Sequence, residues 1–254
     1  MKTKASASRS RIPPSGTRWR PCAPRRALLA TLLAPAWATA LESPMLPWHD
    51  TPSTRLAALA LVESLNAELL ASPSATRVLE HWCAAHQLAD PAEVRAEPLG
   101  SQPDEADEAI RHDLEVDAHD LVIHRRVALS CGGRLLSVAD NWYVPARLSQ
   151  AMNQQLERTQ QPFGKVVAPL QPYRRTLSAR LLWSPLAEGW ELAPRHYAAG
   201  EAAVPAPHEP APLDVPQALF EHRALMSGGD HRPIAELRET YQRGLLDFPE
   251  PAIR

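Results

Sequence analysis

The sequence predicts an α+β domain in which helices pack on an antiparallel β-sheet. Over residues 53–88 the apolar residues recur at intervals of three and four, which is typical of helices that bury one face. From residue 121 onward the interval changes to two, and glycine-bearing turns separate the apolar runs, which indicates antiparallel hairpins. Helices that precede a block of antiparallel strands favour the α+β class.

Two helices are predicted in the first part of the domain. One covers residues 53–71 and ends before Pro73, because proline lacks the backbone N–H that a helix interior needs. Ser74 then caps a second helix that continues to about Leu88, since a serine hydroxyl accepts a hydrogen bond from a first-turn N–H group. We expect both helices to pack on the sheet through their apolar faces.

The sheet is predicted over about residues 116–245 and contains two hairpins. The first joins residues 121–130 to residues 134–144 through a Cys-Gly-Gly turn, and the second joins residues 218–226 to residues 233–241. The other expected elements are a strand at 174–183, a short helix at 148–159, a tight loop at 162–164 and solvated loops at 90–113 and 198–216. Residues 41–254 are therefore expected to form a single domain.

The charged residues are distributed unevenly along the chain. The sequence has 27 Lys and Arg against 29 Asp and Glu, and residues 1–40 hold eight of the basic residues and none of the acidic ones. Removing those eight leaves 19 basic against 29 acidic residues in residues 41–254. An acidic body argues against a nucleic-acid partner, because phosphate binding needs clustered Lys and Arg.

The first forty residues have the pattern of a signal peptide. Two arginines precede the apolar run 27–40, which ends in an Ala-Thr-Ala tripeptide of the kind that signal peptidase cleaves. We expect cleavage after Ala40 and export, most simply to the periplasm. The run is too short for a bilayer and Pro35 interrupts it, so no membrane span is predicted. The alternatives are a wrongly assigned start codon or a disordered cytoplasmic tail.

The cysteines and histidines do not predict a metal site or a cofactor. Beyond the leader only Cys83 and Cys131 remain, and they either pair in an oxidising compartment or stay as buried free thiols. His81 and His86 flank Cys83, but helical geometry turns these two histidines about 140° apart. His222 is expected to be a core histidine. Gly-rich phosphate loops and the Gly-x-Ser-x-Gly motif are absent from the sequence, and we expect neither metal nor cofactor.

Two charged residues fall on apolar strand faces. Strict alternation places Arg125 in one apolar row and Glu239 in another. The rows are Leu121, Ile123, Val127 and Leu129 for the first, and Pro233, Ala235, Leu237 and Tyr241 for the second. A buried arginine needs an anionic partner, which is either a protein carboxylate or a ligand carboxylate. A carboxyl in apolar surroundings has a raised pKa, which prepares it as a general acid or base. The alternative is a purely structural Arg125–Glu239 ion pair.

Three segments together resemble the chorismate pyruvate-lyase family and the related UTRA ligand-binding domains. They are the first hairpin, with Arg-Arg-Val-Ala-Leu at 125–129 and Trp-Tyr-Val-Pro at 142–145, the Pro-Phe-Gly loop at 162–164, and the last strand at 232–241. Their order matches the order of the family's elements, and the resemblance covers roughly residues 55–245. Each motif is short, so the resemblance depends on all three.

The resemblance implies an antiparallel sheet with packed helices and a small enclosed pocket for an aromatic acid. It implies that Arg125 binds the ring carboxylate, that Glu239 faces the reacting ether, and that backbone N–H groups of Phe163 and Gly164 hold a carboxylate. Tyr241, the aromatic residue after Glu239, joins the same pocket. The implied reaction is that of a carbon–oxygen lyase, which eliminates pyruvate from chorismate and leaves 4-hydroxybenzoate without a metal or organic cofactor.

The sequence also departs from the family pattern. Asn141, a further candidate ligand-binding residue, stands where the family carries an arginine, and Glu239 is one residue farther from Pro233 than the family spacing. Without a bulge Arg238 would take the glutamate position, so the register of Glu236 and Glu239 stays open. These departures and the predicted export leave an alternative function open: a non-catalytic exported protein of the same fold that binds a small aromatic carboxylic acid. The oligomeric state is not predicted.

Overall fold

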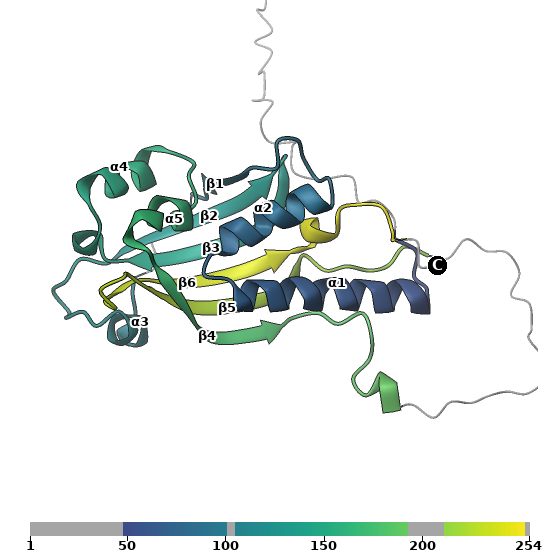
Figure 1. Ribbon diagram of the computed structural model, residues 1–254. Coiled ribbons are helices and arrows are strands. Elements are labelled where there is room, and N and C mark those ends of the chain that lie inside the picture. Colours follow the sequence, from purple (N-terminus) through teal and green to yellow (C-terminus); the bar gives the residue numbers. More distant parts are fainter. Residues whose placement is uncertain (1–47, 101–104, 193–210, 252–254) are drawn as a thin grey trace, which may run out of the picture. The chain divides into compact units, whose positions relative to one another are not determined.

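The computed structural model describes residues 48–100, 105–192 and 211–251, and its helices and strands are shown in Figure 1. The predicted signal peptide and most of the loop predicted at 198–216 lie outside these residues. The helices are α1 (Pro52–Ala71), α2 (Ala75–Ala85), α3 (Glu108–Asp113), α4 (Gln150–Arg158) and α5 (Phe163–Val166). The strands are β1 (Val94–Pro98), β2 (Ile123–Cys131), β3 (Arg134–Tyr143), β4 (Tyr173–Leu181), β5 (Ala218–Ser227) and β6 (Pro233–Gln242).

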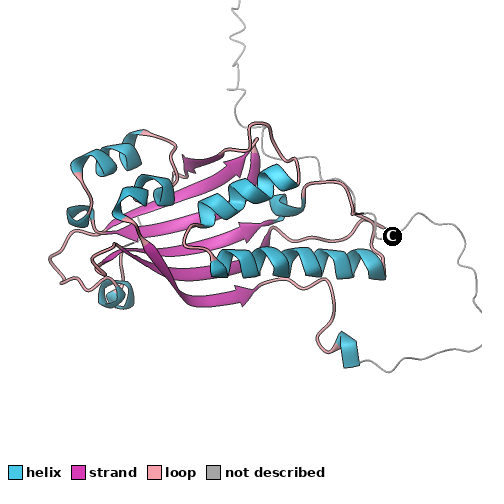
Figure 2. Ribbon diagram, viewed as in Figure 1, coloured by secondary structure: helices cyan, strands magenta, loops and turns pink. Residues whose placement is uncertain are grey.

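The six strands form a single antiparallel sheet in the order β1-β2-β3-β6-β5-β4, with helices packed on it (Figure 2). The α+β class and the antiparallel sheet that the sequence predicts are therefore confirmed. Both predicted hairpins form, as β2–β3 and β5–β6. The first turns through Gly132 and Gly133, whose φ angles of +58° and +81° are costly for other residues.

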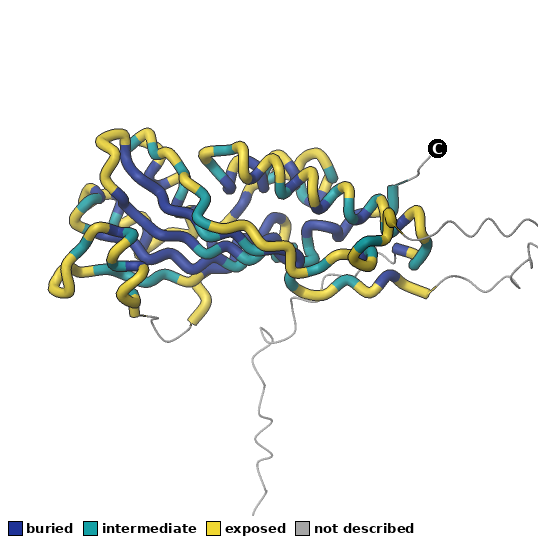
Figure 3. The backbone as a smooth tube through the Cα atoms, turned by 90° about the horizontal axis from the view of Figure 1, so that it is seen from below, coloured by how far each residue is buried: buried dark blue, intermediate teal, exposed yellow. Residues whose placement is uncertain are grey.

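The second helix begins where Ser74 predicts it, and α1 begins at Pro52, one residue before the predicted start, with Thr51 as its cap. The Thr51 hydroxyl accepts a hydrogen bond from the Thr54 N–H at 3.1 Å, and the Ser74 hydroxyl accepts one from the Arg77 N–H at 3.3 Å. Their apolar faces pack against the sheet, and the buried residues concentrate between the two layers (Figure 3). On the opposite face of the sheet, α3 packs over Trp142 and Leu225. The sheet therefore separates two apolar layers.

Two loop predictions are wrong. Residues 90–113 contain β1 and α3, so the sheet begins before residue 116. Strand β1 is hard to recognise because only Val94 and Ala96 point into the core of a five-residue edge strand. Residues 163–166 form the one-turn helix α5, with Pro162 at the position before it, where a tight loop was predicted. A proline at this point is compatible with a helix start, because first-turn N–H groups have no intrahelical partner.

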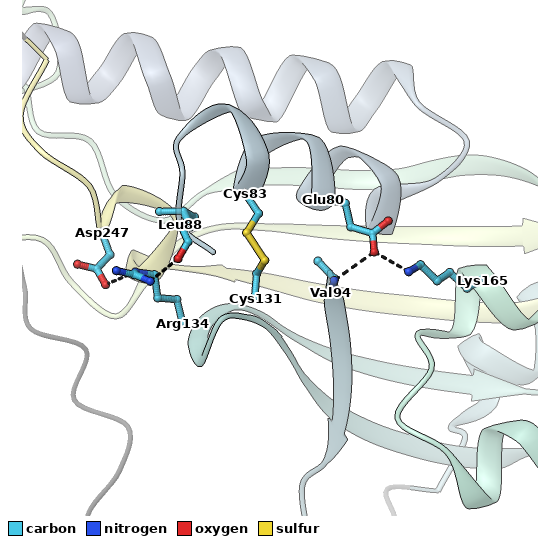
Figure 4. Close-up of a disulfide and its surroundings, with 8 residues drawn as sticks. All are labelled: Glu80, Cys83, Leu88, Val94, Cys131, Arg134, Lys165 and Asp247. Atoms are coloured by element: carbon cyan, nitrogen blue, oxygen red, sulfur yellow. Dashed lines mark hydrogen bonds and ion pairs between the residues drawn. A yellow bond between two sulfur atoms is a disulfide. The ribbon is translucent and has the colours of Figure 1, made fainter. Parts of the chain in front are cut away.

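Helix α2 is tied to the sheet by three links (Figure 4). Cys83 on α2 and Cys131 at the end of β2 form a disulfide, which decides between the two states that the sequence left open. Glu80 lies 2.5 Å from Lys165 on α5 and accepts a hydrogen bond from the backbone of β1 at 3.1 Å. Just beyond the end of α2, the Leu88 carbonyl accepts a hydrogen bond from Arg134 on β3. The Arg134 side chain also lies 2.8 Å from the Asp247 carboxylate. These links fix the position of α2 over the sheet.

Candidate functional site

A small cavity lies between the sheet and the start of α2 and α5. Its volume is about 30 Å³, which is room for one or two water molecules. The lining residues come from five strands and from the two helix starts: Ser74, Ala75, Thr76, Val127, Leu129, Ala139, Asn141, Pro162, Phe163, Gly164, Arg174, Met226, Leu237 and Glu239. Most of these residues are apolar, and Arg174 and Glu239 are the only charged ones among them.

Arg174 and Glu239 form a buried ion pair on the wall of this cavity. Nη2 of Arg174 lies 2.6 Å from Oε2 of Glu239, and the two side chains are 2% and 7% exposed. Arg174 belongs to the edge strand β4 and Glu239 to β6, so the arginine side chain crosses β5 to reach the carboxylate. Burial lowers the pKa of Arg174, but the Glu239 carboxylate and Tyr241 more than offset this effect and hold the pKa above its usual value.

The Arg174 guanidinium keeps donors that the protein does not use. Its Nε and Nη1 atoms are buried and make no hydrogen bond of good geometry with any residue that the structure describes. A buried donor without an acceptor costs about 1–3 kcal/mol, and a charged one costs more. The guanidinium is therefore prepared to donate to an acceptor that the described part of the chain does not supply.

Two further side chains, those of Tyr241 and His222, lie next to the Arg174–Glu239 pair. The Tyr241 hydroxyl donates to Oε2 of Glu239 at 3.2 Å, and burial followed by the neighbouring carboxylate raises the pKa of Tyr241 well above its usual value. His222 on β5 packs on the Tyr241 ring, and its Nε2 lies 2.8 Å from Oδ1 of Asn66 on α1. Burial, and then the Arg174 charge, lower the pKa of His222 to about 4. Both groups are neutral at pH 7.

The start of α2 forms the opposite wall of the cavity. Ser74, Ala75 and Thr76 line it, and the N–H groups of a helix's first turn have no intrahelical acceptor. The aligned peptide dipoles place roughly half a positive charge at such a helix start. Gly164 on α5 lies next to this helix start, because a Cβ atom at Gly164 would be in van der Waals contact with Oγ1 of Thr76, at 3.5 Å. The wall and Arg174 together favour an anion.

Sequence comparison places the chain in a family. A protein of Sinorhizobium fredii (strain NBRC 101917 / NGR234), which carries the name uncharacterized protein y4mC, is 42% identical over 207 residues. The alignment covers 81% of this chain and 84% of that protein. The chain belongs to the y4mC family. No protein-family model matches the sequence.

Solved structures with a similar arrangement have low sequence identity to this y4mC-family chain. PhnF from Mycobacterium smegmatis is 13% identical, with a TM-score of 0.41 over 72% of this chain and 68% of that one. The ligand-binding domain of a protein assigned to the GntR family of transcriptional regulators, from Bordetella bronchiseptica, is 15% identical, with a TM-score of 0.37. That similarity covers 59% of this chain and 83% of the domain.

Four of the residues predicted from the sequence line the cavity of the y4mC-family chain. They are Asn141, Phe163, Gly164 and Glu239. Tyr241 does not line it but bonds to Glu239 from the core side.

Alternation along β6 places Glu239 on the face of the sheet that α1 and α2 cover. Glu236 lies on the opposite face and pairs with Arg223. The β3–β6 pairing is regular, but the β5–β6 register shifts between Ala235 and Pro233, so β6 has an extra residue in the stretch that precedes Glu239. The register question is therefore settled in favour of Glu239, with a bulge on the β5 side.

Arg125 occupies a different place from the one predicted. It does not line the cavity, and the Arg125–Glu239 ion pair is wrong, because Glu239 pairs with Arg174 instead. Nη2 of Arg125 donates to the Gln161 carbonyl at 3.4 Å, and burial lowers its pKa. Its Nη1 is buried and has no hydrogen-bond partner among the described residues. Roles for these residues in ligand binding stay predictions.

Arg174 is the residue that the sequence did not single out. It stands beside Arg175 in the predicted strand at 174–183, so one of the two had to face inward. That parity was the available signal, but most of β4 is exposed, and an arginine on an edge strand is ordinary. Its importance follows only from its burial against Glu239.

Metal and membrane features are not part of this site. Across the residues that the structure describes, no group of His, Cys, Asp and Glu could hold a metal ion. Within the same ranges, no helix is both long and apolar enough to cross a membrane.

Acidification is expected to destabilise the fold through His222. The folded chain keeps this imidazole neutral down to about pH 4, whereas the unfolded chain protonates it below its ordinary pKa of 6.5. Because the unfolded state binds more protons between these values, the free energy of unfolding falls by on the order of 2 kcal/mol as the pH drops through this window. Urea unfolding at pH 7.0 and 4.5 measures the loss.

The control for this prediction compares two histidine variants. His222→Asn should remove this part of the pH dependence, while His112→Asn should leave it unchanged, because the His112 side chain is 88% exposed. An equal loss of stability in the wild type and the His222→Asn variant would contradict the prediction.

Proposed function

We propose that this chain binds a small carboxylic acid in the cavity beside the Arg174–Glu239 pair. The observation that carries the proposal is the buried Arg174 guanidinium, whose Nε and Nη1 donors have no acceptor among the described residues. A planar, two-oxygen anion suits the fork of an arginine. The start of α2 adds further donors on the opposite wall. The apolar lining, which includes Phe163 and Leu237, suits an aromatic or aliphatic body on the acid.

Ligand entry requires the cavity to widen. Ligand pockets usually enclose about 300–1,000 Å³, and this cavity measures about 30 Å³. Helix α5 is the part of the wall that we expect to move, because it has a single turn and no disulfide link to the sheet. Its apolar anchors are Phe163 and Val166, and its ion pair to α2 is Lys165–Glu80. That pair is partly exposed, so its contribution to stability is small. The sheet and the disulfide-linked α2 form the fixed walls.

The geometry favours binding over the lyase reaction. In the lyase role Glu239 would pass a proton to the leaving group. Here Oε2 of Glu239 is paired with Arg174 and accepts a hydrogen bond from the Tyr241 hydroxyl, and Arg125 lies outside the cavity. The roles that the resemblance assigns to Arg125 and Glu239 would therefore require both side chains to rearrange.

A melting experiment tests the proposed function. We expect millimolar 4-hydroxybenzoate to raise the melting temperature of the full chain, because a ligand that binds only the folded state stabilises it. Arg174→Lys keeps the charge but loses the guanidinium fork, and should weaken binding roughly 10- to 100-fold. Arg180→Lys is the matched control, since Arg180 lies on the same strand with its side chain 68% exposed.

Two results would count against this proposal. If no small carboxylate shifts the melting temperature of the wild type, the cavity is not a carboxylate site. If Arg180→Lys weakens binding as much as Arg174→Lys, the acid binds elsewhere. Incubation with chorismate belongs to the same series, and formation of 4-hydroxybenzoate would establish the lyase reaction in place of binding alone.

A further inference from the structure

The charges around the cavity balance before any ligand enters. Arg174 supplies one positive and Glu239 one negative charge, and no other described residue on the cavity wall is charged. Tyr241 on the same strand and His222 on the neighbouring β5 contact this pair but are neutral at pH 7. The residues that α2 and α5 contribute to the wall are uncharged, and Lys165 at the end of α5 is engaged by Glu80.

A ligand that carries only a carboxylate would upset this balance. Nη2 of Arg174 already lies 2.6 Å from Glu239. A guanidinium binds two oxygens through either its Nε–Nη2 edge or its Nη1–Nη2 edge, and Nη2 is part of both. A second carboxylate would therefore lie beside the first, with one guanidinium between them in a buried site. Like charges at this distance oppose each other strongly. The start of α2 offsets only part of the excess, because its dipole corresponds to about half a charge.

Glu239 has the capacity to accept a cation from the ligand. Both of its polar contacts within the described part of the chain, to Arg174 and to the Tyr241 hydroxyl, are made by Oε2. An ionised carboxylate has about four acceptor positions, so Oε1 remains able to accept further hydrogen bonds. Because Glu239 itself lines the cavity, a donor on the ligand can reach it.

We propose that the ligand is a zwitterion with an apolar body, whose carboxylate binds Arg174 and the start of α2 and whose protonated amine binds Glu239. Such a ligand leaves each buried charge with an opposite partner. Uncharged acceptors such as Asn141 and the hydroxyl of Thr76 can fix its orientation, and the apolar wall covers the remainder. The inference rests on the proposed carboxylate site and narrows the class of acid that the site takes.

Matched probes test the inference by titration calorimetry on the full chain at pH 7.5. Phenylalanine, 3-phenylpropanoate and phenethylamine share one body and differ only in their charged groups, and 4-hydroxybenzoate is the fourth probe. We expect phenylalanine to bind at least about tenfold tighter than the other three, since it alone keeps both buried charges paired. Its affinity should be constant between about pH 6 and 8. A carboxylate without an amine should take up about one proton and lose affinity roughly tenfold per pH unit.

A variant adds a readout that a merely structural role of Glu239 would not move. Glu239→Gln removes the negative charge at almost constant shape, so the preference should invert and 3-phenylpropanoate should bind tighter than phenylalanine. If this variant does not fold, the proton uptake of the wild type decides the question by itself.

The outcomes separate the two proposals. Binding of 3-phenylpropanoate or 4-hydroxybenzoate as tightly as phenylalanine at pH 7.5 overturns the zwitterion inference but leaves the carboxylate site intact. Carboxylates that bind while phenylalanine does not bind overturn it equally. Failure of all four probes to bind contradicts the proposed function itself.

Discussion

Replacing Arg174 with methionine is expected to lower the free energy of unfolding by about 3–5 kcal/mol. The substitution leaves the Glu239 carboxylate, 7% exposed, without its cation. Methionine fills much of the volume of the arginine stem, so the loss reports the unpaired charge more than a cavity. Arg180→Met is the matched control on the same strand. Its side chain is 68% exposed and its partner Glu221 lies 3.5 Å away, so the loss should stay below about 0.5 kcal/mol.

A second substitution identifies the cause of the loss. The double variant Arg174→Met with Glu239→Gln should recover most of the loss, because the buried charge is gone. A double variant as unstable as the single one would show that packing, not charge, is responsible.

Loss of the Cys83–Cys131 disulfide is expected to lower the free energy of unfolding by roughly 4 kcal/mol. The bond joins residues 48 positions apart, and a cross-link of this span restricts the unfolded chain by about that amount. Both cysteines are fully buried, so Cys83→Ala with Cys131→Ala also removes contacts in the core. Urea unfolding with and without a reductant measures the effect in the wild type.

The double alanine variant is also the control for this measurement. A reductant should destabilise the wild type and leave the variant unchanged. Equal stability of the wild type in both conditions would contradict the prediction. Because α2 carries the cavity wall at Ser74–Thr76 and the bond anchors α2 to β2, we also expect weaker ligand binding after reduction.

Most of the local structure could be read from the sequence. The cap at Ser74 was visible as a hydroxyl residue ahead of helical spacing, and the two hairpins followed from alternation and turns. The face of Glu239 also followed from alternation, because the side-chain period of a strand is a property of the strand itself. Strand β1 was missed because an edge strand of five residues with two buried side chains carries too little of this signal.

The arginine that pairs with Glu239 could not be predicted from the sequence in the same way. Arg125 and Arg174 each lie two strands away from Glu239, on opposite sides of it in the sheet, so even the strand order does not choose between them. The choice follows from packing. The segment between α4 and α5 covers Arg125 and takes a hydrogen bond from it, while Arg174 lies across β5 with its side chain 2% exposed.

The sequence by itself determined the class of fold and the elements of its hairpins, and its alternation placed Glu239 in an apolar row while its register stayed open. These depend on propensity and periodicity, which act between residues close in the chain. The tertiary structure decided that Glu239 pairs with Arg174, that Cys83 bonds to Cys131, and that α2 and α5 enclose a cavity beside the pair. Those contacts join residues 48 or more positions apart, and only the packed chain brings such residues within bonding distance.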